Sequence, residues 1–202
     1  GLAQVPALPT GPWEYRNVVL TRGAITRSFR FDLSVKGREP RGCLCAEILL
    51  AATRITVVNV HLGLAWGERR AQIDGLLGPS GPVAAAVGPL GLGGDFNDWP
   101  PGPTSRLLGR AFLDAAWPSL DFAATFPAGW PIFRLDRLYC TPELVPTGYE
   151  VHRSKPARGA SDHLPIVATF EGVDVEQIVD LEADLVIAGG LGFTPPDAVT
   201  QM

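Results

Sequence analysis

Four short apolar runs in this sequence have the pattern of β-strands, and each begins, ends or is interrupted at a residue able to bind a metal ion or transfer a proton. The clearest run, residues 54–61, is rich in β-branched side chains and ends in a histidine. Polar groups beside a buried strand are costly unless something pairs with them. The runs therefore predict strands whose ends converge on one site. They are residues 54–61, 90–96, 135–140 and 166–170.

Many strands with few helices between them predict an α+β sandwich. Residues 26–35 alternate apolar and polar side chains, as an antiparallel strand with one wet face does, and residues 43–51 form the return strand. Helices are expected at residues 68–77 and 104–110 within this body, with a further helical turn at 83–87 as an option. The glycines at 91–94 are followed by Asp-Phe-Asn-Asp and not by a helix, which excludes a dinucleotide-binding loop.

The composition fits one globular domain: 46% of the 202 residues are hydrophobic and 19% are charged. Prolines and glycines break the longest uncharged stretch, residues 75–94, so we expect no membrane span. The three cysteines make an odd count without zinc spacing, which favours reduced thiols and a cytoplasmic location. Cys43 and Cys45 are expected in the core.

The net charge of −4 is unevenly distributed. Residues 171–202 hold seven acidic residues and no lysine or arginine, which leaves 17 basic and 14 acidic residues in the body. This balance is compatible with an anionic substrate and lacks the strongly basic surface of a tight nonspecific DNA-binding protein. We expect residues 1–170 to form the domain and residues 171–202 to be an acidic extension.

Residues two apart on a strand face the same side, so Asp95 projects with Asn97, and His61 with Asn59. A carboxylate and an amide placed so can hold a nucleophilic water and contact a phosphoryl oxygen. Simpler alternatives exist for each residue. Asn97 can belong to a turn, and His61 can be structural. Asp136 can pair with a neighbouring arginine, at 134 or 137.

Asp162 and His163 are adjacent, and on a regular strand they would point apart. Pro165 disfavours helical geometry at the residue before it. For both side chains to serve one site, they must lie in an irregular segment ahead of the strand.

Together, four motifs in this order resemble the endonuclease/exonuclease/phosphatase superfamily, the deoxyribonuclease I-like fold. Shorter matches to a bacterial branch are Glu-Pro-Arg-Gly at 39–42, Glu-Arg-Arg at 68–70 and Thr-Phe-Pro at 125–127. The resemblance runs from about residue 17 to residue 170. The four motifs are Asn-Val-His-Leu at 59–62, Gly-Asp-Phe-Asn at 94–97, Leu-Asp-Arg at 135–137 and Ser-Asp-His-Leu-Pro at 161–165.

The resemblance implies a four-layer αββα sandwich and hydrolysis of phosphate esters with Mg²⁺ or Mn²⁺. It implies that His163 is the general base or transition-state partner and that Asp136 orients it. A neighbouring carboxylate of this kind raises an imidazole pKa and fixes its tautomer. By the same resemblance, Asp162 is a carboxylate of the divalent-metal site.

Three further roles follow from the same resemblance. Asp95 would position the water or contribute to the metal shell. Asn97 would bind the phosphate, and His61 would contact it or protonate the leaving oxygen. Hard divalent cations prefer carboxylate oxygens, in agreement with this set.

The family also begins with an Asn-bearing strand, a helix and a strand ending in Gln-Glu, whose glutamate is a principal metal ligand. Nothing before Asn17 matches these elements, so the fold is expected to be N-terminally incomplete. Residues 175–185 are expected to form a helix and 185–188 a strand, which suggests a circularly permuted replacement. Gly189 and Gly190 stand where Gln-Glu would be.

Three functions follow as alternatives. The first is a metal-dependent phosphodiesterase, nuclease or phosphatase acting on nucleic acid, a lipid headgroup or a small molecule. The second is a non-catalytic binding module that keeps the fold but lacks the metal-ligand glutamate. The third is a hydrolase with a zinc site, although no familiar zinc spacing is present. Its zinc ligands would be His61, Asp95, Asp162 and His163.

Overall fold

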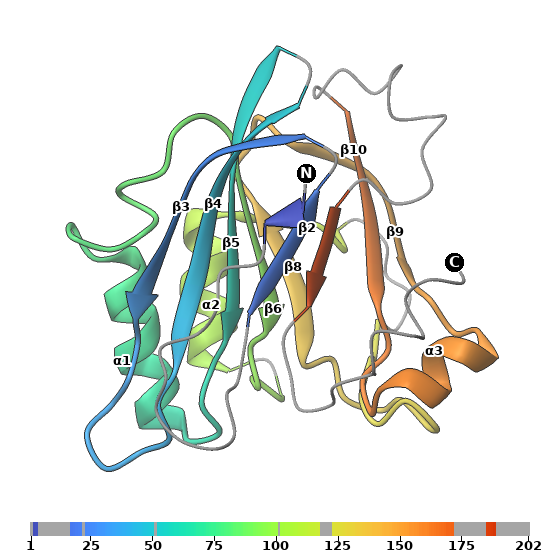
Figure 1. The fold of residues 1–202 in the computed structure, drawn as a ribbon. Coiled ribbons are helices and arrows are strands. Elements are labelled where there is room, and N and C mark those ends of the chain that lie inside the picture. The colour runs from blue at the N-terminus through green and yellow to red at the C-terminus, as the bar shows by residue number, and fades with distance from the viewer. Residues whose placement is uncertain are drawn as a thin grey trace.

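A six-stranded mixed sheet forms the centre of the molecule in the computed structural model (Figure 1). Its order is β3-β4-β5-β6-β8-β7, with β5 and β6 parallel and the other neighbours antiparallel. The strands are β3 (Ala24–Asp32), β4 (Gly42–Leu50), β5 (Thr53–His61), β6 (Leu90–Asp95), β7 (Leu113–Asp114) and β8 (Asp136–Cys140). The structure describes residues 2–3, 17–21, 23–50, 52–100, 102–117, 123–171 and 185–188.

Five further strands lie outside this sheet. One pair is antiparallel, β9 with β10, and a separate sheet has the order β1-β2-β11. Figure 1 shows β2, β11, β9 and β10 in front of and beside the six-stranded sheet. The strands are β1 (Leu2–Ala3), β2 (Val18–Thr21), β9 (Val145–Val151), β10 (Ile166–Glu171) and β11 (Leu185–Ala188).

Two apolar cores use the two faces of the large sheet. One core packs β-strand residues such as Val58 and Leu92 against Ile73 of α1 (Trp66–Leu77) and Leu108 of α2 (Pro103–Ala111). The other packs the opposite face against Val19 of β2, with Phe170 of β10 at its margin. The strands alternate their side chains between these cores, which is why both faces of the sheet are apolar.

The predicted elements agree with the observed ones to within a few residues in most cases. The strand expected at 26–35 instead spans Ala24–Asp32, because Oδ1 of Asp32 accepts the Ser34 amide at 2.8 Å and turns the chain. The three cysteines are buried thiols, with Cys43 and Cys45 in the core as expected. A short third helix, α3 (Lys155–Ala160), was not predicted.

The strand expected at 185–188 is present as β11, and it pairs antiparallel with β2 from Leu185↔Thr21 to Ala188↔Val18. The helix expected just before it falls outside the residues that the structure describes. The division into residues 1–170 and an acidic extension therefore stays a prediction.

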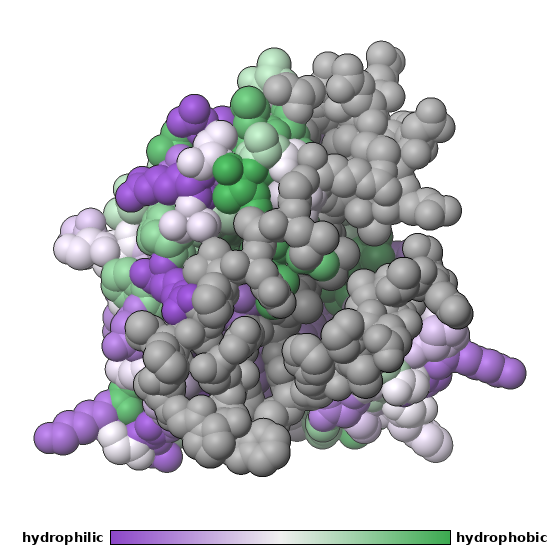
Figure 2. Space-filling model, in the orientation of Figure 1, coloured by the Kyte–Doolittle hydropathy of each residue, from purple (hydrophilic) through white to green (hydrophobic). Residues whose placement is uncertain are grey.

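Figure 2 shows hydrophilic side chains projecting beside the loop after β3 and beside α3. Near the top of the view, over β4 and β5, hydrophobic side chains gather next to further hydrophilic ones. Among the described helices, none is both long enough and apolar enough to span a bilayer.

Candidate functional site

Three of the predicted residues stand side by side at one edge of the six-stranded sheet. His61 is the register partner of Asp95, and Asp95 is the register partner of Asp136. The last residues of β5 and β6 meet the first residue of β8 because β8 runs antiparallel to them. Directly opposed residues point to the same face of a sheet, so the three side chains form a row. Nε2 of His61 lies 3.5 Å from Oδ2 of Asp95.

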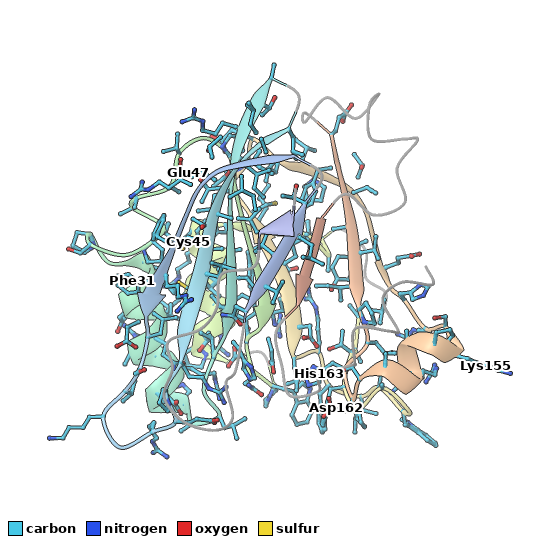
Figure 3. All side chains as sticks on the ribbon, viewed as in Figure 1. Phe31, Cys45, Glu47, Lys155, Asp162 and His163 are labelled. Atoms are coloured by element: carbon cyan, nitrogen blue, oxygen red, sulfur yellow. The ribbon has the colours of Figure 1, made fainter. Side chains whose placement is uncertain are left out.

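His163 reaches this row from the segment before β10, in the other pair of strands. Its Nδ1 lies 2.7 Å from Oδ2 of Asp136. Figure 3 shows His163 and Asp162 together at the lower ends of the strands, far from Glu47. Asp136 does not pair with either neighbouring arginine: Arg134 instead binds Asp114 at 2.6 and 3.0 Å. The site thus combines three side chains at the edge of the six-stranded sheet with His163 from the segment that leads into β10.

Residues 161–165 are irregular, as the position of Pro165 predicted. Backbone bonds fix this segment: the Leu164 amide donates to the carbonyl of Thr125 at 2.9 Å, and the Ala128 amide donates to that of Asp162 at 2.7 Å. The ring of Phe126 also packs on the His163 ring, with centroids 4.8 Å apart. The loop 125–128 therefore holds His163 against Asp136.

The buried charges shift three pKa values in different directions. Burial lowers the pKa of His163, but its bond to Asp136 and the nearby carboxylates outweigh burial and raise it above 6.5. Burial, together with the charges of Arg41 and His163, lowers the pKa of His61 to about 4. Burial and the charge of Asp136 raise the pKa of Asp95 to about 6. Near neutral pH, His61 is therefore uncharged, and Asp95 titrates close to the working range of a general base.

Asn97 lies beyond the end of β6. It is therefore not in the extended strand that the prediction of a shared face with Asp95 required. Its φ is +50°, and its amide donates to Oδ1 of Asp95 at 2.9 Å. Nδ2 of Asn97 donates to the carbonyl of Leu62 at 2.9 Å. An asparagine tolerates this left-handed conformation better than most residues. The turn interpretation is therefore correct for the backbone, and the turn still places Asn97 beside Asp95.

The described residues do not complete a site for a divalent cation. Among them, no three His, Cys, Asp or Glu side chains surround one point, so the zinc alternative gains no support. Asp162 is exposed, and Oδ2 of Asp136 is already bound by His163 and Thr125. The sequence contains no Gln-Glu pair to supply the family's glutamate. The assignment of Asp95 and Asp162 as metal ligands stays a prediction.

Two residues near the site were quoted in motifs without a role. Oγ1 of Thr125 donates to Oδ2 of Asp136 at 2.5 Å, so Thr125 orients the carboxylate that orients His163. Arg41, directly before β4, is buried and pairs with Glu39 at 2.9 Å, and its charge favours lower pKa values for both His61 and Asp95. The sequence signal that could have identified both residues as part of the site is their place in the family-like motifs Thr-Phe-Pro and Glu-Pro-Arg-Gly.

Replacing Thr125 with valine should lower the free energy of unfolding by about 1–3 kcal/mol, because a buried hydrogen bond to a carboxylate is lost while the volume is kept. Urea denaturation measures the change. Thr147→Val is the control, since Thr147 bonds only the exposed hydroxyl of Thr169. Equal effects of the two substitutions would contradict the role given to Thr125.

The histidine C2–H resonances should report the opposite pKa shifts in protein treated with a chelator. We expect the His61 resonance to titrate near pH 4, and that of His163 to titrate above the ordinary histidine range because its pKa is raised. In Asp136→Asn the His163 midpoint should move down, because the hydrogen-bonded carboxylate no longer favours the imidazolium. A His163 midpoint unchanged by Asp136→Asn contradicts the pairing.

Comparison with known sequences supports the motif-based assignment. Residues 4–163 match the profile of the endonuclease/exonuclease/phosphatase family. The uncharacterized protein YbhP of Escherichia coli K12 is 34% identical over 158 residues, which cover 75% of this chain. The match spans 61% of the length of YbhP, so the chain covers less than two thirds of that relative.

Solved structures with low sequence identity share the fold. A functionally unknown conserved protein from Enterococcus faecalis V583 superposes with a TM-score of 0.63 at 20% identity, over 78% of this chain and 77% of that one. A mannosyl-6-phosphatase from Bacteroides thetaiotaomicron gives 0.57 at 18% identity, over 73% and 67%. D. rerio TDP2 in complex with a single-strand DNA product gives 0.58 at 16%, over 73% and 68%. The chain has the four motifs in order, it has this fold, and its residues 4–163 match the family profile. It therefore belongs to the endonuclease/exonuclease/phosphatase family.

Proposed function

We propose that this chain hydrolyses phosphate esters at the edge of the sheet where His61, Asp95 and Asp136 lie in register. One observation carries the proposal: His163, from the other pair of strands, is bonded to Asp136 at 2.7 Å within this row. Two carboxylates and two imidazoles gathered at a strand edge form an acid–base cluster with pKa values moved apart. Buried charge clusters are weak evidence for stability and frequent at functional sites, which favours a functional role for this one.

In the proposed reaction Asp95 accepts a proton from the attacking water, since a pKa of about 6 suits a base that works near neutrality. The water oxygen bonds to phosphorus, the ester P–O bond opposite it breaks, and the leaving oxygen takes a proton from solvent. Asp95 then releases its proton to solvent. His163 donates a hydrogen bond to a phosphoryl oxygen from Nε2, since Asp136 holds Nδ1, and its raised pKa favours the protonated form that donates from both nitrogens. His163 thus acts as the transition-state partner.

His61 and Asn97 complete the contacts to the phosphate. With a pKa of about 4, His61 is neutral and suits a hydrogen-bonding role, not that of an acid for the leaving oxygen. Nδ2 of Asn97 carries a second hydrogen beside the one given to Leu62, which is available to a phosphoryl oxygen. No step here passes through a metal ion. The requirement for Mg²⁺ or Mn²⁺ implied by family membership is a separate prediction.

Hydrolysis of bis(p-nitrophenyl) phosphate and p-nitrophenyl phosphate, each with Mg²⁺, Mn²⁺ or a chelator, tests the proposal. We expect release of p-nitrophenol from at least one ester, and its loss in the chelator if the family's metal requirement holds. Tight binding of phosphate without turnover of either ester would favour the alternative, a non-catalytic module that keeps the fold.

A further inference from the structure

One arginine of α1 joins the two loops that follow β5 and β6. Arg69 is buried, with 9% of its side chain exposed. Its Nη1 donates to the carbonyls of Gly63 at 3.3 Å and Leu64 at 2.5 Å. Its Nη2 lies 3.6 Å from Oδ1 of Asp98. A guanidinium holds its donors in a rigid planar fork that reaches acceptors on two loops, whereas a lysine offers one compact ammonium on a flexible stem.

Neighbouring side chains of α1 fix the first loop further. Oε1 of Gln72 accepts the Gly63 amide at 2.9 Å, and Oε2 of Glu68 accepts the Ala65 amide at 3.4 Å. Gly63 lies so close to Glu68 that a Cβ added there would stand 1.9 Å from the carboxyl carbon. Both acceptors are buried, so the loop after His61 is held by groups that water cannot replace.

Asp98 fixes the second loop to the start of α2. Its Oδ2 accepts the amides of Gly102 at 3.0 Å and Ser105 at 2.9 Å, together with the Ser105 hydroxyl at 2.5 Å. Arg137 donates to the Asp98 carbonyl at 3.2 Å. Asp98 is 1% exposed, so its contact with Arg69 is screened from solvent.

The two loops meet at the site itself. The Leu62 amide donates to the carbonyl of Asp95 at 2.9 Å, and Nδ2 of Asn97 donates to the carbonyl of Leu62 at 2.9 Å. Leu62 stands between His61 and Gly63 in the chain. A shift of the loop after β5 would therefore move His61, Asp95 and Asn97 relative to one another.

We propose that Arg69 is a positioning residue that sets the distance between the loop directly after His61 and the loop carrying Asn97. It touches neither substrate nor reacting atoms, and it acts through Gly63, Leu64 and Asp98. The effect on turnover rests on the proposed phosphoester hydrolysis. The effect on the two loops does not.

Arg69→Met and Arg70→Met form a matched pair for the test in the full chain. Arg70 follows directly on the same helix but is exposed and pairs with Asp74 at 3.0 Å. With bis(p-nitrophenyl) phosphate, Arg69→Met should lower kcat about 100-fold with KM within about twofold, as expected for misplaced groups. Arg70→Met should change both by less than about twofold. A rise in KM at unchanged kcat in Arg69→Met would overturn the positioning role.

Amide hydrogen exchange gives a readout that needs no hydrolysis. In Arg69→Met the amides of Leu62 and Asn97 should exchange about tenfold faster while those of β10 stay unchanged, and Arg70→Met should change neither. Should wild type hydrolyse no phosphoester, the proposed function fails, and faster exchange at these amides still supports the link between the loops. Unchanged exchange in Arg69→Met overturns the inference even in an active enzyme.

If Arg69→Met does not fold, Gly63→Ala and Gly67→Ala provide a second matched pair of variants for the same exchange measurement. Gly63→Ala must push the Glu68 carboxyl off the Ala65 amide, whereas a Cβ at Gly67 meets nothing within 4 Å. Gly63→Ala should speed exchange at Leu62 in the same way, and Gly67→Ala should not. Equal exchange in the two variants counts against the inference.

Discussion

Replacing His163 with alanine should lower kcat/KM for phosphodiester hydrolysis by about 1,000-fold and leave the fold intact. The imidazole is held against Asp136, and removing it takes away the donor that stabilises charge on the phosphoryl oxygen. His163 is partly exposed, with 25% of its side chain in contact with solvent, so the fold does not depend on it. Steady-state kinetics with bis(p-nitrophenyl) phosphate measure the loss.

His152→Ala is the matched control for His163→Ala. His152 is exposed and contributes to the fold through its backbone amide, which donates to the Pro165 carbonyl at 2.9 Å. Its removal should leave kcat/KM within about twofold, as most exposed substitutions do. Equal losses in the two variants, or near-normal activity in His163→Ala, would remove the imidazole from the proposed reaction.

Asp95→Asn should abolish most turnover and yet stabilise the protein when metal is chelated. The carboxylate is 7% exposed, and burial with the charge of Asp136 raises its pKa from 3.8 to about 6. A shift of about two pH units corresponds to a cost of up to about 3 kcal/mol for keeping the carboxylate ionised at pH 7. An asparagine keeps an oxygen for the Asn97 amide and removes this cost.

The gain in Asp95→Asn should depend on pH in one direction. The Asp95 carboxyl ionises above its ordinary pKa of 3.8 in the unfolded chain but only above about 6 in the folded one. Its cost to the free energy of unfolding is therefore absent below 3.8, grows between the two values and is complete above about pH 6. The difference in unfolding free energy between variant and wild type is therefore largest at pH 7 and shrinks as the pH falls from 6 towards 3.8. His61 is present in both proteins, so its own titration largely cancels in the comparison.

Urea denaturation at pH 7 and at pH 4 measures this difference, with Asp74→Asn as control. Asp74 is exposed and paired only with Arg70 on the surface of α1, so its substitution should change stability little at either pH. Lower stability of Asp95→Asn at pH 7 would mean that the carboxylate contributes to folding and would count against its role as a buried base.

Sequence patterns predicted most of the strands and several of the residues that the structure brings together at the candidate site. The β-branched run ending at His61 and the motif around Asp95 mark strand ends directly, and the irregular segment at 161–165 follows from Pro165. The register that places His61, Asp95 and Asp136 in one row needs the pairing of three strands, which no local pattern encodes.

The supporting contacts could not be predicted in the same way. Thr125 reaches Asp136 across a loop, and Arg69 reaches Asp98 from another element, so both contacts depend on tertiary packing. Alternation also failed for Asn97, because β6 ends at Asp95 and the chain turns with a positive φ. A short polar side chain that bonds its own neighbouring backbone outweighs strand periodicity at such a point.

The central claim is that side chains from separate strands meet around one phosphate. A titration of the full chain with inorganic phosphate in the presence of Mg²⁺, followed by the three histidine C2–H resonances, tests it most directly. The account predicts that His61 and His163 shift together with one dissociation constant and that His152 stays unchanged. Shifts of His61 and His163 with different constants, or a response of His152 alone, would contradict it.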